Sequence, residues 1–231
     1  MPLLKIIALN DYTQLLVWKI TETFDELFQS VSLKDVSLAR VENMKAEGHQ
    51  KGFLSVRRLL IEAGYTDFDL YYDEFGKPHI EAGSAKWEET SNSQPPTPSS
   101  KHISISHSND FSVIVLSDVN IGADLEILKD KTLLLAPRYM DVSHLQNLSK
   151  EDELIKATVV WGIKEAVFKL KNVIGISFKD HIFENDFNLS DKKCTVELRI
   201  DNIVEHFEII FDFIENYVFV CAFNAAKAEK K

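Results

Sequence analysis

The sequence predicts an α+β fold in which each half of the chain pairs one long helix with a short antiparallel sheet. Three observations support this prediction: a long helical segment in each half, runs of alternating apolar and polar residues, and a globular composition with 45% hydrophobic and 27% charged residues. A chain of 231 residues makes either one large domain or two small halves that share a core. The two long helices align only loosely, so a duplicated fold stays open on these grounds.

The first long helical segment, residues 37–63, lies in the N-terminal half, which we expect to span residues 1–116. Phe53, Val56 and Leu60 recur at helical spacing, and Gly64 suits a helix end because glycine readily adopts the left-handed conformation. Short apolar stretches around this segment indicate strands. The other expected elements of this half are strands at 4–9, 15–20, 68–72, 103–105 and 112–116 and a short helix at 22–28.

Residues 83–100, within the same half, are rich in serine and proline. A segment of this composition cannot bury enough apolar surface to order its backbone. We expect a flexible surface loop and not a domain boundary, because strands resume directly after it.

The C-terminal half, expected at residues 117–231, contains the second long helix at 151–171. Ser149 is its expected N-cap, and the acidic residues that follow suit the positive end of the helix dipole. Pro137 should break or kink a preceding helical segment at 133–140. The strong alternation between residues 182 and 223 predicts antiparallel strands with one solvent-exposed face, and a further strand is expected at 121–127.

Charge and composition exclude several function classes. The net charge of −10 disfavours general nucleic-acid binding, because contacts to phosphates dominate that affinity. The longest apolar run, at 217–223, is far shorter than a membrane span, and the N-terminus lacks the pattern of a signal peptide. Cys194 and Cys221 form no metal-binding motif, so we expect reduced, buried thiols and a cytoplasmic protein. We also expect a monomer.

One strand carries two carboxylates on the same face. Asp124 and Glu126 are two residues apart in the segment Gly-Ala-Asp-Leu-Glu, and side chains alternate along a strand. Two neighbouring carboxylates repel each other and need either solvent or a cation. The pair therefore indicates either an exposed strand end or a site for a hard metal such as Mg²⁺, which favours carboxylates together with phosphate oxygens.

The second long helix carries Glu165 and Lys169 four residues apart, on one face. The simplest interpretation is a surface ion pair, which contributes only about 0.3–0.5 kcal/mol. Beside a carboxylate pair, Glu165 would be a third metal ligand and Lys169 a phosphate contact.

Two further motifs lie in the N-terminal half. Gly76-Lys77-Pro78 predicts a turn with a projecting ammonium group, which is either solvated or a ligand contact. The segment 103–108 places His107 at the end of a strand, where it either faces a cleft or forms hydrogen bonds within the turn.

In this order, Gly-Lys-Pro, Ser-His-Ser, Gly-x-Asp-x-Glu and Trp-x-x-Lys-Glu-x-x-x-Lys resemble the 4′-phosphopantetheinyl transferase superfamily, specifically the larger type that activates peptide and fatty-acid synthases. The resemblance runs from about Arg40 to Ser177, and the remaining strands agree in pattern only. It implies two similar α/β halves packed as an intramolecular pseudo-dimer, with coenzyme A between them. It also implies Mg²⁺-dependent transfer of 4′-phosphopantetheine from coenzyme A to a serine of an apo acyl or peptidyl carrier protein, with release of adenosine 3′,5′-bisphosphate.

The resemblance implies roles for single residues. Asp124, Glu126 and Glu165 correspond to the metal ligands, and Glu165 also to the group that accepts the proton of the serine. Lys169 corresponds to the lysine that contacts the phosphates and protonates the leaving group. The residues implied to bind coenzyme A are Arg40, Arg57, Gly76, Lys77, Pro78, Ser106, His107 and Lys169, with Arg58 as the alternative to Arg57.

The sequence departs from the family pattern before the second long helix. Family members often carry Arg-Phe followed by a glutamate, whereas Arg138-Tyr139 is followed here by Asp141 and, at the expected spacing, by His144. The loop at 83–100 is also longer than the corresponding link in the family. Carrier proteins are usually acidic near the target serine, so Lys129, Lys131 and Arg138 are either a docking rim or merely solvated cations.

Two other function classes remain as alternatives. One is a catalytically silent module that keeps the binding of coenzyme A or of a carrier protein. Four intact chemical residues argue against it: Asp124, Glu126, Glu165 and Lys169. The other is a different metal-dependent enzyme that cleaves a pyrophosphate, for example in ATP.

Overall fold

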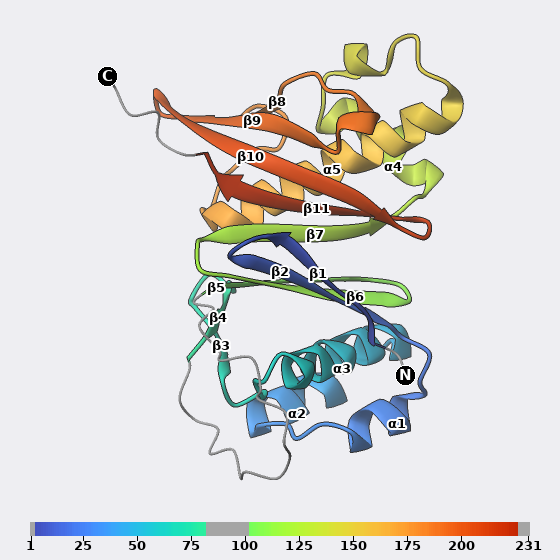
Figure 1. Cartoon of the computed structure of the whole chain (residues 1–231), viewed down its shortest axis with the longest axis vertical. Coiled ribbons are helices and arrows are strands. Elements are labelled where there is room, and N and C mark those ends of the chain that lie inside the picture. The colour runs from blue at the N-terminus through green and yellow to red at the C-terminus, as the bar shows by residue number, and fades with distance from the viewer. Residues whose placement is uncertain (1–2, 82–101, 226–231) are drawn as a thin grey trace. The chain divides into compact units, whose positions relative to one another are not determined.

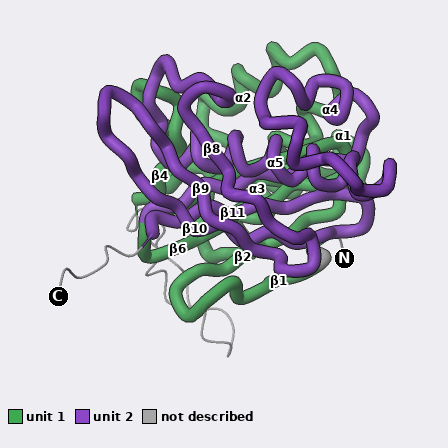
Figure 2. Tube along the Cα trace, turned by 90° about the horizontal axis from the view of Figure 1, so that it is seen from above, with its two compact units in different colours: residues 1–119 green, residues 120–231 purple. Residues whose placement is uncertain are grey.

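The chain has an α+β fold, as the sequence predicts. The structure is a computed structural model that describes residues 3–81 and 102–225, so the loop expected at 83–100 lies outside the described residues. The chain divides into two compact units, residues 1–119 and 120–231 (Figure 2). The division follows the last strand of the first sheet, which ends at Ser117.

The N-terminal unit contains a four-stranded antiparallel sheet (Figure 1). Its strands are β1 (Leu3–Asn10), β2 (Thr13–Lys19), β5 (His102–Ser108) and β6 (Phe111–Ser117), in the order β1-β2-β6-β5. All seven residues of β6 are buried; the strand lies inside the sheet, between β2 and β5, and helix α3 packs on it. A separate two-stranded hairpin, β3 (Leu70–Tyr72) and β4 (Pro78–Ile80), lies next to β5.

The helical region expected at 37–63 is two helices, and this corrects the sequence prediction. After α1 (Phe24–Gln29), the chain forms α2 (Asp35–Glu42) and α3 (Glu47–Glu62). Side chains end α2 by satisfying its last carbonyl groups: Asn43 donates to Ala39 O at 2.7 Å, and Gln50 of α3 donates to Val41 O at 3.1 Å. The free carbonyls of a helix end need such partners, so the break is stable.

Helix α3 packs its apolar stripe against the sheet. Phe53, Leu54, Val56, Leu59 and Leu60 are all buried in the same hydrophobic cluster, which also includes residues of β2, β5 and β6. Ala63 caps the helix, and Gly64 follows in the left-handed conformation with φ of 85°. The helix therefore ends where the sequence predicts it.

The C-terminal unit contains a five-stranded antiparallel sheet in the order β7-β11-β10-β9-β8. Its strands are β7 (Ile121–Ile127), β8 (Ile182–Glu184), β9 (Lys193–Ile200), β10 (Ile203–Ile214) and β11 (Tyr217–Asn224). The helical segment expected at 133–140 begins and ends earlier, as α4 (Asp130–Leu135), and a 3₁₀ turn with Pro137 follows it. Proline lacks the amide hydrogen that an α-helix would need at this point.

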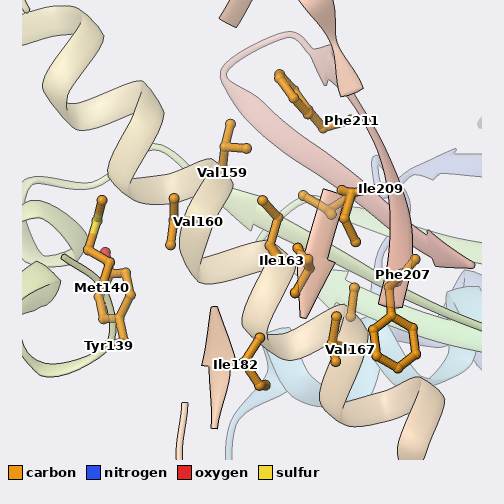
Figure 3. Packing of buried hydrophobic residues seen from close by; sticks show 14 of the residues in the cluster. Tyr139, Met140, Val159, Val160, Ile163, Val167, Ile182, Phe207, Ile209 and Phe211 are labelled. Carbon is orange, nitrogen blue, oxygen red and sulfur yellow. The ribbon is translucent and has the colours of Figure 1, made fainter. Parts of the chain in front are cut away.

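The long helix α5 (Lys150–Lys171) covers the second sheet. Ser149 accepts a hydrogen bond from the amide of Asp152 at 3.1 Å and is the N-cap that the sequence predicts. Figure 3 shows Ile163 and Val167 of α5 close to Phe207 and Ile209 of β10. These residues form the centre of a hydrophobic cluster that is closed at its edges by Tyr139, Met140 and Ile182.

Two glycines allow α5 to lie unusually close to the sheet. A Cβ atom on Gly122 of β7 would overlap the carbonyl oxygen of Ala166 and lie 2.6 Å from the amide nitrogen of Leu170. A Cβ atom on Gly162 of α5 would lie 2.7 Å from a methyl carbon of Val220 in β11. Since real carbon atoms do not approach so closely, only glycine is compatible with this packing distance.

Both cysteines are free, Cys194 on β9 and Cys221 on β11; Cys221 is buried as the sequence predicts, whereas Cys194 is only partly buried. Burial raises the pKa of Cys221, and burial together with the Glu184 carboxylate raises the pKa of Cys194 to about 12. Thiols with raised pKa values are poor nucleophiles.

Among the helices in the described part of the chain, none is long and apolar enough to cross a membrane.

Replacing Gly122 with alanine should strongly destabilise the C-terminal unit. The new methyl group meets the α5 backbone, which cannot rotate away as a side chain can, so we expect a loss of about 3 kcal/mol or more, at or above the upper end of typical overpacking. Urea unfolding followed by circular dichroism measures this loss. Gly48→Ala is the control, because a Cβ atom there meets nothing within 4 Å. Equal stability of the two variants would contradict the close packing.

Candidate functional site

The face of β7 that α5 covers contains the carboxylate pair predicted from the sequence. Asp124 is only 4% exposed, although it is an acidic residue. Lys169 of α5 donates to Asp124 Oδ1 at 2.7 Å and to the carbonyl oxygen of Ala123 at 3.1 Å. The lysine thus supplies a positive charge to a carboxylate that water hardly reaches, and such burial is costly without a partner.

Glu126 lies two residues further along β7 and is held by an indole. Trp161 Nε1 of α5 donates to Glu126 Oε1 at 3.0 Å. The pKa of Glu126 is raised to about 7, chiefly by burial and then by the negative charge of Asp124. The Trp161 hydrogen bond and the Lys169 charge oppose this rise but do not cancel it, and Glu165 adds to it.

Glu165 belongs to the same electrostatic cluster. Burial and the charge of Asp124 raise its pKa, and Lys169 lowers it. We call Asp124, Glu126, Glu165 and Lys169 the carboxylate cluster. Three acidic groups thus share one partly buried region with a single lysine among them, and the excess negative charge favours the binding of a proton or a cation.

The chemistry of this cluster suits a hard divalent cation. Carboxylate oxygens are the ligands that Mg²⁺ prefers, and this ion usually takes only one or two of them together with phosphate oxygens and water. Within residues 3–81 and 102–225, no three His, Cys, Asp or Glu side chains are gathered into a complete metal-binding set. The cluster therefore offers the right type of ligand but, as its side chains stand, not a finished coordination shell.

The lysine next to Glu165 has a different role from its neighbours. Lys164 is 1% exposed and forms an ion pair with Glu184 of β8. Burial lowers the pKa of Lys164, and the Glu184 carboxylate partly compensates. His144, the residue at the departure from the family pattern, has its Nδ1 atom 3.6 Å from Glu184 Oε1. His144 therefore adjoins this internal ion pair.

The Gly76-Lys77-Pro78 turn is organised by one carboxylate. Asp73 accepts hydrogen bonds from the amides of Phe75 and Lys77, both at 2.9 Å, and contacts His79 Nε2 at 3.1 Å. Gly76 has a φ of 84°, a conformation that other residues adopt only with strain. The turn thus fixes the start of the Lys77 side chain, which is partly exposed.

The Ser-His segment lies near the end of β5, a strand that contacts β4 of the β3–β4 hairpin. Ser106 is buried and His107 is exposed. Arg40 at the end of α2 is also exposed, and its guanidinium carbon lies 5.4 Å from the ring centre of Phe53 and 5.7 Å from that of Tyr72. Arg40 therefore contacts the hairpin that carries Lys77.

Arg57 is buried in the N-terminal unit. It is 3% exposed, its Nε donates to Asp67 at 2.9 Å, and its guanidinium carbon lies 3.4 Å from the centre of the Phe53 ring. A guanidinium so enclosed is held by the fold and is not the exposed basic group that the resemblance implies. Arg58, the alternative to Arg57, is more accessible: its side chain is 24% exposed and contacts Glu62 on the same helix, the Ser30 carbonyl and the ring of Trp18.

Two depressions lie elsewhere in the C-terminal unit. One has a volume of about 540 Å³ and is lined by residues that include His144, Lys164 and Glu184. The other, of about 500 Å³, includes His144, Lys156 and Asp186. Their charged residues are largely paired with each other, as in the contacts of Lys164 with Glu184 and of Lys156 with Asp186. Neither depression includes a member of the carboxylate cluster.

Three residues in or beside the carboxylate cluster have contacts that were not predicted from the sequence. Trp161 was part of the motif but had no assigned partner, and Lys164 and Gly122 had no assigned role. The only sequence signal for Trp161 is its position four residues before Glu165, one helical turn away on the same face. No known family model matches the sequence, and no curated protein matches it significantly.

The raised pKa of Glu126 predicts how stability depends on pH. The folded protein holds this proton more tightly than the unfolded chain, so the free energy of unfolding should fall as pH rises from about 4.5 to about 7. A rise of the Glu126 pKa from 4.5 to about 7 corresponds to roughly 3 kcal/mol of the free energy of unfolding. In EDTA, Glu126→Gln should therefore raise the Tm at pH 8 by several degrees and leave it nearly unchanged at pH 4.5.

Differential scanning calorimetry at both pH values measures this effect. Glu208→Gln, at an exposed position of β10, is the matched control and should leave the Tm unchanged at both. If Glu126→Gln melts no higher than the wild-type protein at pH 8, Glu126 does not carry the unfavourable charge.

Proposed function

We propose that the protein is a Mg²⁺-dependent 4′-phosphopantetheinyl transferase that modifies a serine of an apo acyl or peptidyl carrier protein. The observation that carries the proposal is the carboxylate cluster: residues from two distant motifs, Asp124 and Glu126 on β7 and Glu165 and Lys169 on α5, act on one another electrostatically. This set combines ligands for a hard cation, a base and a phosphate-binding ammonium.

The topology of the two units supports the further proposal that the chain is a duplicated fold forming a pseudo-dimer. In the N-terminal unit, β2 is followed by α3 and by the hairpin β5–β6, with the strand order β2-β6-β5. In the C-terminal unit, β7 is followed by α5 and, later, by the hairpin β10–β11, with the strand order β7-β11-β10. In both, the last strand pairs with the strand that precedes the long helix, β6 with β2 and β11 with β7, and the long helix packs on the resulting sheet.

The proposed reaction is an attack of the carrier serine oxygen on the phosphorus that bears the pantetheine arm. The new P–O bond forms as the bond to adenosine 3′,5′-bisphosphate breaks, and Glu165 accepts the serine proton. Burial and the charge of Asp124 raise its pKa, which makes this carboxylate a stronger base than an exposed glutamate. Mg²⁺, when bound by Asp124, Glu126 and Glu165, would neutralise charge on the diphosphate.

Lys169 serves the leaving group in this proposal. Its ammonium is bound to Asp124 but its side chain is 30% exposed, so it can exchange the carboxylate for a phosphate oxygen without leaving its helix face. There it would donate a hydrogen bond, and finally a proton, to the departing phosphate. Trp161 keeps Glu126 oriented through the Nε1 hydrogen bond.

The N-terminal unit supplies the residues proposed to bind coenzyme A. Arg40, Lys77 and His107 are the exposed or partly exposed members of the implied set, and coenzyme A carries both a diphosphate and a 3′-phosphate. Charge-assisted hydrogen bonds from arginine and lysine bind such groups well. Ser106 is buried next to His107, and Gly76 and Pro78 shape the turn around Lys77.

Incubation of the protein with coenzyme A, Mg²⁺ and a panel of apo carrier proteins tests the function. We expect at least one carrier to gain the mass of one phosphopantetheine group, as read by intact mass spectrometry, and EDTA to abolish the gain. Glu165→Gln should lower the rate at least about 100-fold if it removes the general base. Glu151→Gln, at an exposed position in the first turn of the same helix, should keep full activity.

Two results would point to the alternative functions. Binding of coenzyme A without a mass gain on any carrier would indicate a silent binding module. Hydrolysis of ATP with no reaction of coenzyme A would indicate another enzyme that cleaves a pyrophosphate. Either result would exclude the transferase.

Substitutions of Lys169 and Lys77 should affect different kinetic constants, kcat for Lys169 and the KM for coenzyme A for Lys77. Lys169→Arg keeps a cation for Asp124 but cannot give up a proton, because guanidinium does not deprotonate in proteins. We expect it to lower kcat by about 10²–10⁴-fold if Lys169 is the general acid. Lys77→Ala removes a contact to a phosphate outside the reaction, so it should mainly raise the KM for coenzyme A.

Lys171→Ala is the control for this pair, since Lys171 lies on the same helix but binds Glu205 of β10. It should keep the kcat and KM of the wild-type protein. Full turnover by Lys169→Arg together with loss of kcat in Lys77→Ala would reverse the assigned roles.

A further inference from the structure

We infer that Gly52 of α3 is a positioning residue for His107. Because Gly52 has no side chain, the His107 imidazole can pack against the helix backbone, and this contact sets the position from which the ring binds a phosphate of coenzyme A. The inference rests on the proposed function, because it assigns His107 a ligand. It concerns a residue that none of the motifs includes.

The contact between the two residues is close. A Cβ atom on Gly52 would lie 3.1 Å from His107 Nδ1, 3.2 Å from Cγ and 3.6 Å from Cε1. These are the three closest atoms, so the Nδ1 edge of the ring faces the helix and Nε2 is farther from it. Because separations of 3.1 and 3.2 Å are tighter than ordinary carbon contacts, a methyl group at this position must push the ring by a few tenths of an ångström.

Buried hydroxyl groups prevent the helix from moving instead of the ring. Ser55 Oγ donates to the Gly52 carbonyl oxygen at 2.9 Å and contacts Ser112 Oγ at 2.7 Å, and Ser112 Oγ lies 3.3 Å from the same carbonyl. Ser55 and Ser112 are both fully buried. Hydrogen bonds of Ser55 and Ser112 therefore hold the Gly52 carbonyl against β6.

These hydrogen bonds involve the residue of β6 that lies opposite His107. Ser112 is the residue of β6 that pairs with His107 across the β5–β6 ladder. Ser55 and Ser112 thus connect the turn of α3 at Gly52 to the strand pair that carries His107. A change in side-chain volume at Gly52 cannot be absorbed by sliding α3 along the sheet without breaking buried hydrogen bonds, which is costly. The ring, which is exposed, is the part that gives way.

A small displacement matters because phosphate recognition is directional. A charge-assisted hydrogen bond from imidazole to phosphate needs donor and acceptor in line at about 2.7–2.9 Å. A misplacement of about 1 Å can cost on the order of 100-fold in an enzyme, so a few tenths of an ångström should cost several-fold. The effect should fall on binding and not on the chemical step, because His107 is placed on the nucleotide and not at the carboxylate cluster.

The experiment is a double-mutant cycle on Gly52 and His107, with steady-state kinetics for coenzyme A. We expect Gly52→Ala to raise the KM for coenzyme A by about 3–10-fold and to leave kcat within about twofold. In a His107→Ala background, where the ring is absent, the same substitution should have no further effect. Gly48→Ala on the same helix is the matched control and should keep the wild-type KM.

A readout without any ligand tests the contact itself. The ¹H–¹³C correlation signals of the His107 ring should shift in Gly52→Ala and stay in place in Gly48→Ala. Ring signals that do not respond to Gly52→Ala would overturn the inference, and so would an equal loss of affinity with and without the His107 ring, which would show a general effect on the fold.

The outcome also separates this inference from the proposed function. If the wild-type protein neither binds coenzyme A in a calorimetric titration nor transfers its arm, the proposed function fails and the inference falls with it. If the wild-type protein binds coenzyme A but Gly52→Ala binds it equally well, the proposed function stands and the positioning role of Gly52 is wrong.

Discussion

The close approach of α5 to β7 is the constraint on which the carboxylate cluster depends. Glu165 and Lys169 project from the helix, and Asp124 and Glu126 from the strand, so the distance between the two elements decides whether these groups interact. Gly122 sets this distance, because its missing side chain lets the backbone at Ala166 and Leu170 lie directly against the strand. Gly162 does the same one strand further on, against Val220 of β11. With larger residues the helix would move outward and the charged groups would separate.

Bringing these charges together has an electrostatic consequence. Burial contributes most to the raised pKa values of Glu126 and Glu165, and the negative charge of Asp124 adds to both. The chain offsets part of this cost with Lys169 and Trp161 and leaves the rest as a preference for added positive charge. Lys164, which directly precedes Glu165 on the same helix, forms its ion pair with Glu184, so the two lysine–carboxylate pairs do not compete.

The sequence is informative wherever the deciding interaction is local. The strand at 121–127 was predicted at both of its ends, and the shared face of Asp124 and Glu126 follows from the two-residue period of a strand. The break between α2 and α3 was missed because it depends on Gln50 reaching back nine residues to Val41. The burial of Arg57 was missed for a similar reason: its partner Asp67 lies beyond the end of the helix, and helical spacing alone does not tell Arg57 from Arg58.

The contacts that position functional side chains are the least visible in the sequence. Trp161 and Glu126 are 35 residues apart, and Lys164 and Glu184 are 20 apart, so no local pattern relates them. Glycines are less visible still, because their contribution is an absence of side-chain volume and is recognised only when the neighbouring element is known. Gly122 and Gly52 illustrate this in the two units: each lies where a helix meets a strand, and each removes volume beside a charged or polar group. A glycine inside a regular element lowers its stability, and its presence is explained when the space it leaves is occupied by another part of the molecule.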